Sequence, residues 1–199
     1  NDYYKYQDTG PNPGVSAPAN DPNVIPVGAV WQDSVGRFFW AAGAKDFRTA
    51  SDRVTSFSQR STDVDVIFAQ GALITGAAPG GGVDSQGGTS QATPFVAGMV
   101  AVAQNMADDL LGRRLTPDEF ENLLRSSATT IYDGDDERDN VANLETPLPR
   151  VDMLALAKEI KKLSETEGGP SQVIADDFDQ GVNTNGTVEV SAQVSGNLE

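Results

Sequence analysis

One long apolar stretch, residues 89–111, restricts this chain to folds that can surround a helix. Apolar side chains recur along it at helical spacing, at Val96, Met99, Val100, Ala103 and Met106. Small residues at other positions permit close approach of neighbours, namely Ala92, Ala97, Gly98 and Ala101. The pattern predicts a buried helix, which needs a sheet or further helices around it.

Two apolar runs ahead of this helix, residues 24–30 and 64–68, have the length of strands buried on both faces. Pro26 weakens the first, because proline has no N–H for a sheet ladder. A short apolar piece follows at 73–75, and the glycines within 80–88 indicate a flexible approach to the helix. The aromatic residues of segment 31–61 are expected to pack over the core.

Two further helices are predicted from their end signals. Thr116, Pro117 and Glu119 form a capping box with proline in the first helical position. A third helix is expected over residues 152–164, with Gly168 near its end. Strands that are buried on both faces occur in parallel sheets that helices cover, so these segments predict an α/β fold with a mostly parallel sheet flanked by helices.

Composition excludes several functions. The chain has 29 acidic and 14 basic side chains, a net charge of −15, so binding to a nucleic-acid backbone is not expected. No apolar run approaches the roughly 18 residues of a membrane span. Because Cys and His are both absent, a disulfide framework, a thiolate nucleophile, a cysteine zinc site and an imidazole base cannot arise from these residues.

Both ends of the chain differ from its middle. Residues 1–22 are rich in Gly, Pro, Asn and Asp, which is typical of a surface loop. Residues 187–191 and 193–194 alternate polar and apolar side chains with period two, which predicts a β module that begins at about residue 173. We therefore expect the C-terminal part of a larger domain over residues 1–168, then a linker and the truncated start of a β domain over 169–199. The chain is expected to be truncated at both ends.

The chemistry is concentrated where a glycine-rich loop enters the long helix, in the string GTSQATPFVAG over residues 88–98. Ser90 there is predicted to have an exposed hydroxyl, a free N–H and the positive end of a helix dipole behind it. A nucleophile that attacks a carbonyl needs those features. The alternative is an ordinary N-cap serine, since Ser is a preferred cap.

The string resembles the nucleophile motif of the subtilisin-like serine peptidases, GTSxAxPxVAG, with each specified position matched. Other pieces agree in order: residues 18–29, residues 57–61 beside the family's FSxRG, and residues 65–71 beside its D(I/V)xAPG. Three departures are Ser61 for Gly, an additional Phe68 and Gln70 for Pro. The resemblance covers about residues 1–164.

The resemblance implies a role for each matched residue. Ser90 is the nucleophile that forms the acyl-enzyme, and its N–H is one oxyanion donor. Asn1 falls where the family has its oxyanion asparagine, and Thr89 supports the oxyanion site. Ser16 and Gly88 are implied in substrate binding.

The resemblance further implies a secreted serine endopeptidase that acts on polypeptides without an organic cofactor. The family's chain order is Asp, His, Ser, so the acid and base are expected before Asn1. Without them, the 199 residues alone are expected to be inactive.

Two other functions stay open from the sequence. A sedolisin-type acid peptidase has a related fold and a similar serine motif, and uses Glu as its base. A non-catalytic binding module could keep the peptidase fold. The oligomeric state is not indicated.

The acidic segment 133–140 concentrates oxygen ligands, as a structural calcium site would. Asp133, Asp135 and Asp139 are the candidate ligands. The segment lacks the EF-hand pattern, so a solvated acidic turn is the alternative.

Overall fold

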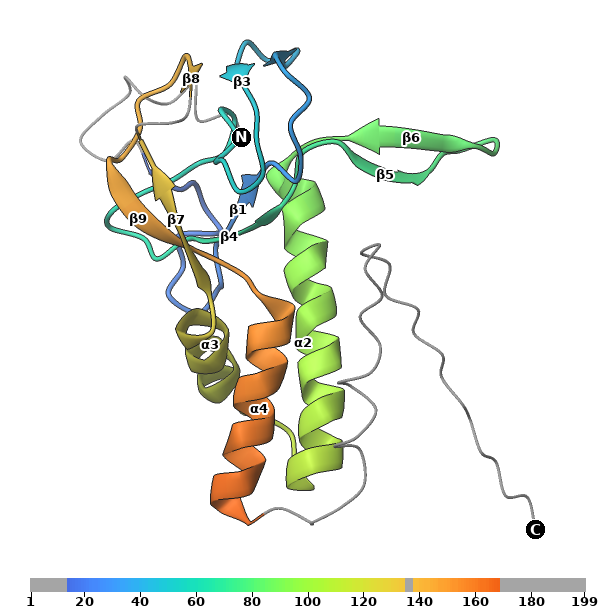
Figure 1. The fold of residues 1–199 in the computed structure, drawn as a ribbon, viewed down its shortest axis with the longest axis vertical. Helices are drawn as coiled ribbons and strands as arrows, with labels where there is room; N and C mark the ends of the chain where they lie inside the picture. The colour runs from blue at the N-terminus through green and yellow to red at the C-terminus, as the bar shows by residue number, and fades with distance from the viewer. Residues whose placement is uncertain (1–13, 135–137, 169–199) are drawn as a thin grey trace.

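The computed structural model describes residues 14–134 and 138–168 and has an α/β architecture (Figure 1). The described residues form a four-stranded sheet of order β1-β4-β9-β7. Its strands are β1 (Val27–Val30), β4 (Ile67–Gln70), β9 (Thr146–Arg150) and β7 (Thr129–Asp133). The first three are parallel, whereas β7 is antiparallel to β9. The predicted α/β class with a mostly parallel sheet is confirmed.

The first two strands begin later than their apolar runs. Pro26 cannot donate to the ladder, so β1 starts at Val27, and the Pro26 carbonyl accepts from the Ile67 N–H at 2.9 Å. That bond aligns the start of β4 with β1. β4 also continues to Gln70, two residues beyond the predicted strand.

Three helices, α2 (Thr89–Leu111), α3 (Pro117–Ser126) and α4 (Met153–Glu167), agree with the predicted ones. The Thr116 hydroxyl accepts from the Glu119 N–H at 3.2 Å, and the Glu119 carboxylate accepts from the Thr116 N–H at 2.8 Å. This confirms the capping box. Helix α4 runs three residues beyond its predicted end, to Glu167, and Gly168 caps it with left-handed backbone geometry.

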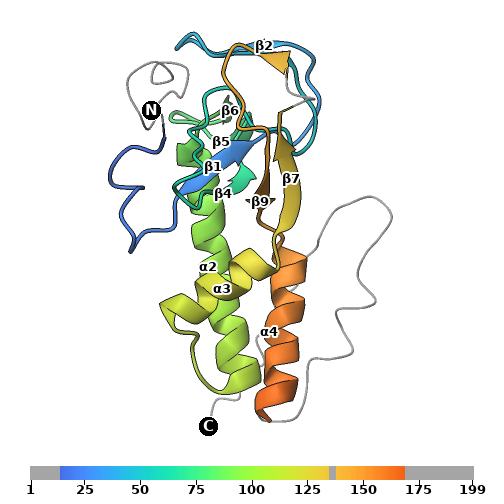
Figure 2. The same cartoon turned by 90° about the vertical axis from the view of Figure 1, so that its left-hand side faces the viewer.

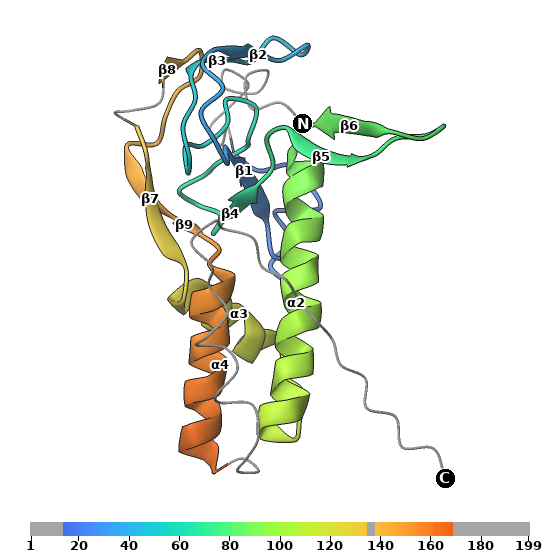
Figure 3. The ribbon, with the colours of Figure 1, turned by 45° about the vertical axis from the view of Figure 1, so that its right-hand side comes forward.

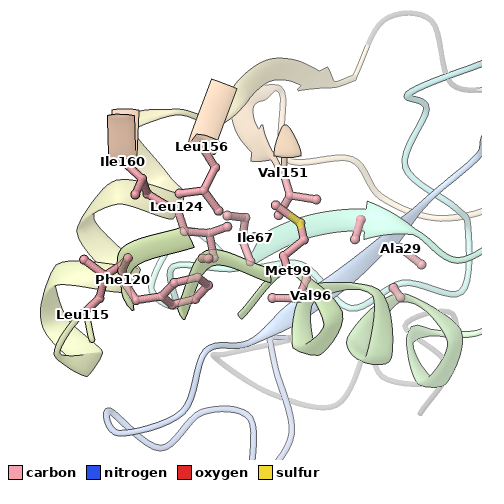
Figure 4. Close-up of a cluster of buried hydrophobic side chains, with 14 of the residues drawn as sticks. Ala29, Ile67, Val96, Met99, Leu115, Phe120, Leu124, Val151, Leu156 and Ile160 are labelled. Carbon is pink, nitrogen blue, oxygen red and sulfur yellow. The ribbon is translucent and has the colours of Figure 1, made fainter. Parts of the chain in front are cut away.

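The main core lies between the helices and the sheet. Helix α2 packs on β1 and β4 with its N-terminal part and lies beside α4 with its C-terminal part (Figures 2 and 3). Figure 4 shows that apolar side chains from all three helices meet Ala29 of β1 and Ile67 of β4. The α2 residues in this core are Ala92, Val96, Met99, Ala103 and Ala107.

The expectation that α2 would be buried is wrong for one of its faces. Phe95 is 47% exposed and Val102 is 49% exposed, and the small residues between them are exposed as well. The described residues supply a sheet and two helices to one side of α2 and leave this apolar face uncovered.

The aromatic segment forms a layer of its own. It contains β2 (Phe38–Phe39) and β3 (Lys45–Arg48), which pair antiparallel, and β3 pairs with β8 (Arg138–Asp139). Phe57 belongs to the main core, and Trp40 packs on it with ring centroids 4.6 Å apart. The expected packing of aromatic residues over the core is confirmed.

The glycines ahead of α2 do not form a flexible approach throughout. Residues 80–82 have positive φ and form the turn of a hairpin, β5 (Ile74–Ala77) with β6 (Val83–Gln86). The hairpin projects from the body of the protein (Figures 1 and 3), and Val83 is 75% exposed. Polar and apolar residues do not alternate over enough positions in β5 or β6 for the sequence to predict either strand.

Among the described helices, none is long and apolar enough to cross a membrane. The predicted β module and the domain boundary at 169 lie outside the described residues.

Candidate active site

Ser90 lies in the first turn of α2, directly after a segment held against the end of β4. The Gly88 N–H donates to the Gly71 carbonyl at 2.8 Å. A Cβ at Gly71 would lie 2.8 Å from the Gly88 carbonyl oxygen and 2.7 Å from Ala29 Cβ. Glycine at 71 therefore permits the close approach that delivers Ser90 to the edge of the sheet.

The Ser90 side chain is not a helix cap. Gly88 is the N-cap residue, without a side-chain capping bond, so the N-cap alternative for Ser90 is wrong. Ser90 is exposed, and no hydrogen bond joins its hydroxyl to the residues that the structure describes. N–H groups in a first helical turn lack intrahelical acceptors and carry the positive end of the dipole. A free hydroxyl thus stands beside donors suited to a developing anion.

A cavity of about 130 Å³ lies on one side of Thr89. Ser16 lines it, and both the N–H and the hydroxyl of Ser16 donate to Gln59 Oε1 at 3.1 Å. Residues 15–19 and Val27 form much of the remaining wall. The structure therefore brings Ser16 and Thr89 together around one cavity.

A second cavity, of about 280 Å³, lies directly at Ser90. Residues 87–90 form one side and Trp40, Ala41, Ala42 and Phe57 form the other. Thr89 lines both cavities. Sequence reasoning missed Trp40 and Phe57 as site residues. Only the folded structure shows that Trp40 packs against Gly87, and the local sequence carries no signal of it.

Two of the three candidate calcium ligands, Asp133 and Asp139, accept hydrogen bonds from the protein itself. Buried Asp133 pairs with Arg60 and accepts from the Leu144 N–H at 2.8 Å. Asp139 accepts from the Val141 N–H at 3.0 Å, and Asp135 lies outside the described residues. Residues 14–134 and 138–168 contain no group of three acidic side chains placed to hold a metal ion. Asn1 also lies outside the described residues.

Burial raises the pKa of Asp139 to about 6, and the neighbouring Asp46 and Asp133 carboxylates act in the same direction. The Val141 N–H and Arg60 oppose this shift. A raised pKa in the folded state means that folding favours the protonated form of Asp139. The protonated carboxyl therefore contributes its full share of stability below roughly pH 3.9, the ordinary pKa of Asp, and this share is lost as the pH rises through about 6.

Replacing Asp139 by asparagine is therefore expected to raise the Tm at pH 8 and to leave it unchanged at pH 4. The isosteric amide keeps an acceptor for the Val141 N–H and removes the buried charge. Thermal unfolding across this pH range measures the effect, with Asp65→Asn, at an exposed position, as control. Equal stabilisation at both pH values would contradict the explanation.

An exposed serine with first-turn N–H groups beside it, at the start of a central helix, has the arrangement that a serine nucleophile needs to attack a carbonyl. A family model described as the Subtilase family, peptidase S8, matches residues 6–159. The chain belongs to the subtilase family. The match favours the subtilisin side over the sedolisin-type alternative.

Curated relatives and solved structures agree with this assignment. Subtilisin-like protease 1 of Trichophyton rubrum is 38% identical over 119 residues, which is 60% of this chain and 19% of the relative. The chain thus spans about a fifth of that relative's length. The patellamide maturation protease PatA is 28% identical with a TM-score of 0.51, over 73% of this chain and 46% of that one. The prenylagaramide maturation protease PagA is 25% identical with the same TM-score, over 72% and 45%.

Proposed function

We propose that this chain carries the nucleophile of a secreted serine endopeptidase. The observation that carries the proposal is the exposed, unengaged Ser90 hydroxyl, in the first turn of α2 and at the second cavity, next to Thr89, which lines both cavities. Its Oγ would attack the carbonyl carbon of a peptide bond, the amine would leave with a proton from the general acid, and water would hydrolyse the acyl-enzyme.

The oxyanion of the tetrahedral intermediate would accept a hydrogen bond from the Ser90 N–H. Asn1 is proposed as the second donor, and Thr89 as support for the site. A single donor of this kind typically contributes about 10²–10³ to turnover. Substrate would bind through Ser16 and Gly88, with a side chain on the acyl side of the scissile bond in the cavity lined by Ser16.

The general base is proposed to come from outside these residues, because the 199-residue sequence contains no histidine. The uncovered apolar face of α2 supports this view, since such a face fits burial against further peptidase structure. Secretion and a structural calcium ion that includes Asp135 are proposals from the family resemblance and from the acidic segment.

The 199 residues expressed alone are expected to show no measurable peptide hydrolysis. An unactivated serine is a weak nucleophile, and a peptidase without its base keeps only roughly 10³–10⁴-fold catalysis over water. Release of a fluorophore from an internally quenched peptide measures this, with the full-length protein as control. Robust turnover by the 199 residues would contradict the assignment of the base to another part of the protein.

A further inference from the structure

The second cavity owes its shape to a tryptophan far from Ser90 in sequence. Trp40 lies in the loop between β2 and β3, and its indole packs on Gly87. A Cβ at Gly87 would come within 2.4 Å of the indole carbons Cη2 and Cζ3. The ring therefore rests directly on the segment that leads into Ser90.

A buried carboxylate fixes the orientation of that ring. The Trp40 Nε1–H donates to Asp46 Oδ2 at 2.6 Å, and Asp46 is 3% exposed. The Ser56 hydroxyl and N–H donate to the same carboxylate at 2.7 and 3.1 Å. Burying a carboxylate costs free energy unless hydrogen-bond donors compensate it. Because the Trp40 indole is one of the three donors to Asp46, rotating the ring away would leave the buried carboxylate with one donor fewer, and this holds the indole in one position.

Neighbouring rings support the indole from behind. Phe38 lies with its ring centroid 4.5 Å from that of Trp40, and Trp31 lies at 5.6 Å. Phe57, which lines the cavity beside Trp40, is almost fully buried. The aromatic wall thus belongs to the packed body of the protein and is preorganised.

The cavity is bounded by two groups of residues of different chemistry. Trp40, Ala41, Ala42 and Phe57 form one group, and residues 87–90, with their polar backbone, line it from the start of α2. The glycines at 87 and 88 contribute no side chain, and the two alanines leave the space empty. The space of about 280 Å³ accommodates one apolar side chain next to the reacting carbonyl.

We propose that Trp40 determines specificity on the leaving-group side of the scissile bond. This inference rests on the proposed function. The cavity at Ser90 would bind an apolar side chain of the residue directly after the cleaved bond, while the cavity lined by Ser16 binds the acyl side. Trp40 is a binding residue here, and Asp46 is a positioning residue that acts through the indole.

The test uses two kinds of substrate and the full-length protein. Quenched peptides that differ only in Leu, Ala or Asp after the scissile bond report on the Trp40 cavity. An ester with the same acyl part and a methoxide leaving group does not fill it. We expect a kcat/KM preference for Leu of about 10- to 100-fold, as for burial of one apolar side chain. In Trp40→Ala it is expected to fall to about 3-fold or less.

Two further variants keep the proposal falsifiable if Trp40→Ala folds poorly. Ala42→Leu adds a branched side chain to the cavity wall and keeps Trp40 itself and its hydrogen bond to Asp46. It is expected to make the Ala peptide a better substrate than the Leu peptide. Phe47→Ala, on the exposed side of β3 and outside the cavity, is the matched control and should leave the preference unchanged.

The outcomes separate the two hypotheses. No ester hydrolysis by the unmodified protein would refute the proposed function itself. Ester hydrolysis together with equal cleavage of the Leu and Asp peptides, or with a preference that survives both Trp40→Ala and Ala42→Leu, would refute only the role of Trp40.

Discussion

Replacing Ser90 by alanine in the full-length protein is expected to lower kcat for peptide hydrolysis by about 10⁶-fold, the loss typical of a removed serine nucleophile. The hydroxyl has no structural task that the change would disturb, because Gly88 rather than Ser90 caps α2. The Tm of the variant should therefore stay within about 1 °C, since an exposed substitution changes stability little. Initial rates with a quenched peptide and a thermal melt measure both quantities.

Ser85→Ala supplies the matched control. Ser85 is an exposed serine of β6, and its hydroxyl shares a 2.7 Å hydrogen bond with Thr75. This variant should retain activity. Labelling by a fluorophosphonate should occur in the unmodified protein and in Ser85→Ala, and should be lost in Ser90→Ala. An unmodified protein that resists the reagent would instead support the non-catalytic alternative.

Local signals explain which parts of the fold were predictable. The caps at Thr116 and Asp152 lie within three residues of their hydrogen-bond partners, so the sequence identifies where α3 and α4 begin. The start of β1 at Val27 is likewise a local effect, because Pro26 directly before it cannot donate a hydrogen bond to the sheet. By contrast, the β5–β6 hairpin has few apolar residues, and no alternation reveals it.

The candidate site also contains residues that the local sequence predicts and residues that it does not. Ser90 is predictable because a glycine-rich loop and an apolar helix adjoin it in sequence. The contact of Trp40 with Gly87 joins segments that are 47 positions apart, and nothing near either residue indicates the other. Asp133 was assigned to a calcium site by composition alone, although burial and Arg60 give it a different partner. Pairings between distant segments depend on tertiary packing that the local sequence does not record.

The buried ion pair between Arg60 and Asp133 leads to the largest expected effect on stability. Arg60 and Asp133 have no solvent exposure at their side chains, and their ion pair joins the segment after β3 to the end of β7. The Arg60 guanidinium also donates to the carbonyls of Thr55 at 2.8 Å and Ser58 at 3.3 Å. Asp133 receives the Leu144 N–H on its other oxygen. The ion pair and its hydrogen bonds thus join three chain segments, residues 55–60, the end of β7 and the segment around Leu144.

Arg60→Met is expected to lower the free energy of unfolding by about 3–5 kcal/mol, because it leaves a buried carboxylate without its cation. Chemical denaturation followed by circular dichroism measures the loss. Arg114→Met provides the control, since its pair with Asp108 at 3.3 Å is exposed and should contribute less than about 1 kcal/mol.

A second substitution distinguishes charge from packing as the origin of that loss. Asp133→Asn, added to Arg60→Met, removes the uncompensated charge and keeps an oxygen that can accept from the Leu144 N–H. The double variant should therefore recover part of the stability that Arg60→Met loses, as buried pairs do when both charges are removed. If the double variant is no more stable than Arg60→Met, the loss arises from the missing donors to Thr55 and Ser58. The ion pair would then act by tying those carbonyls in place rather than by neutralising Asp133.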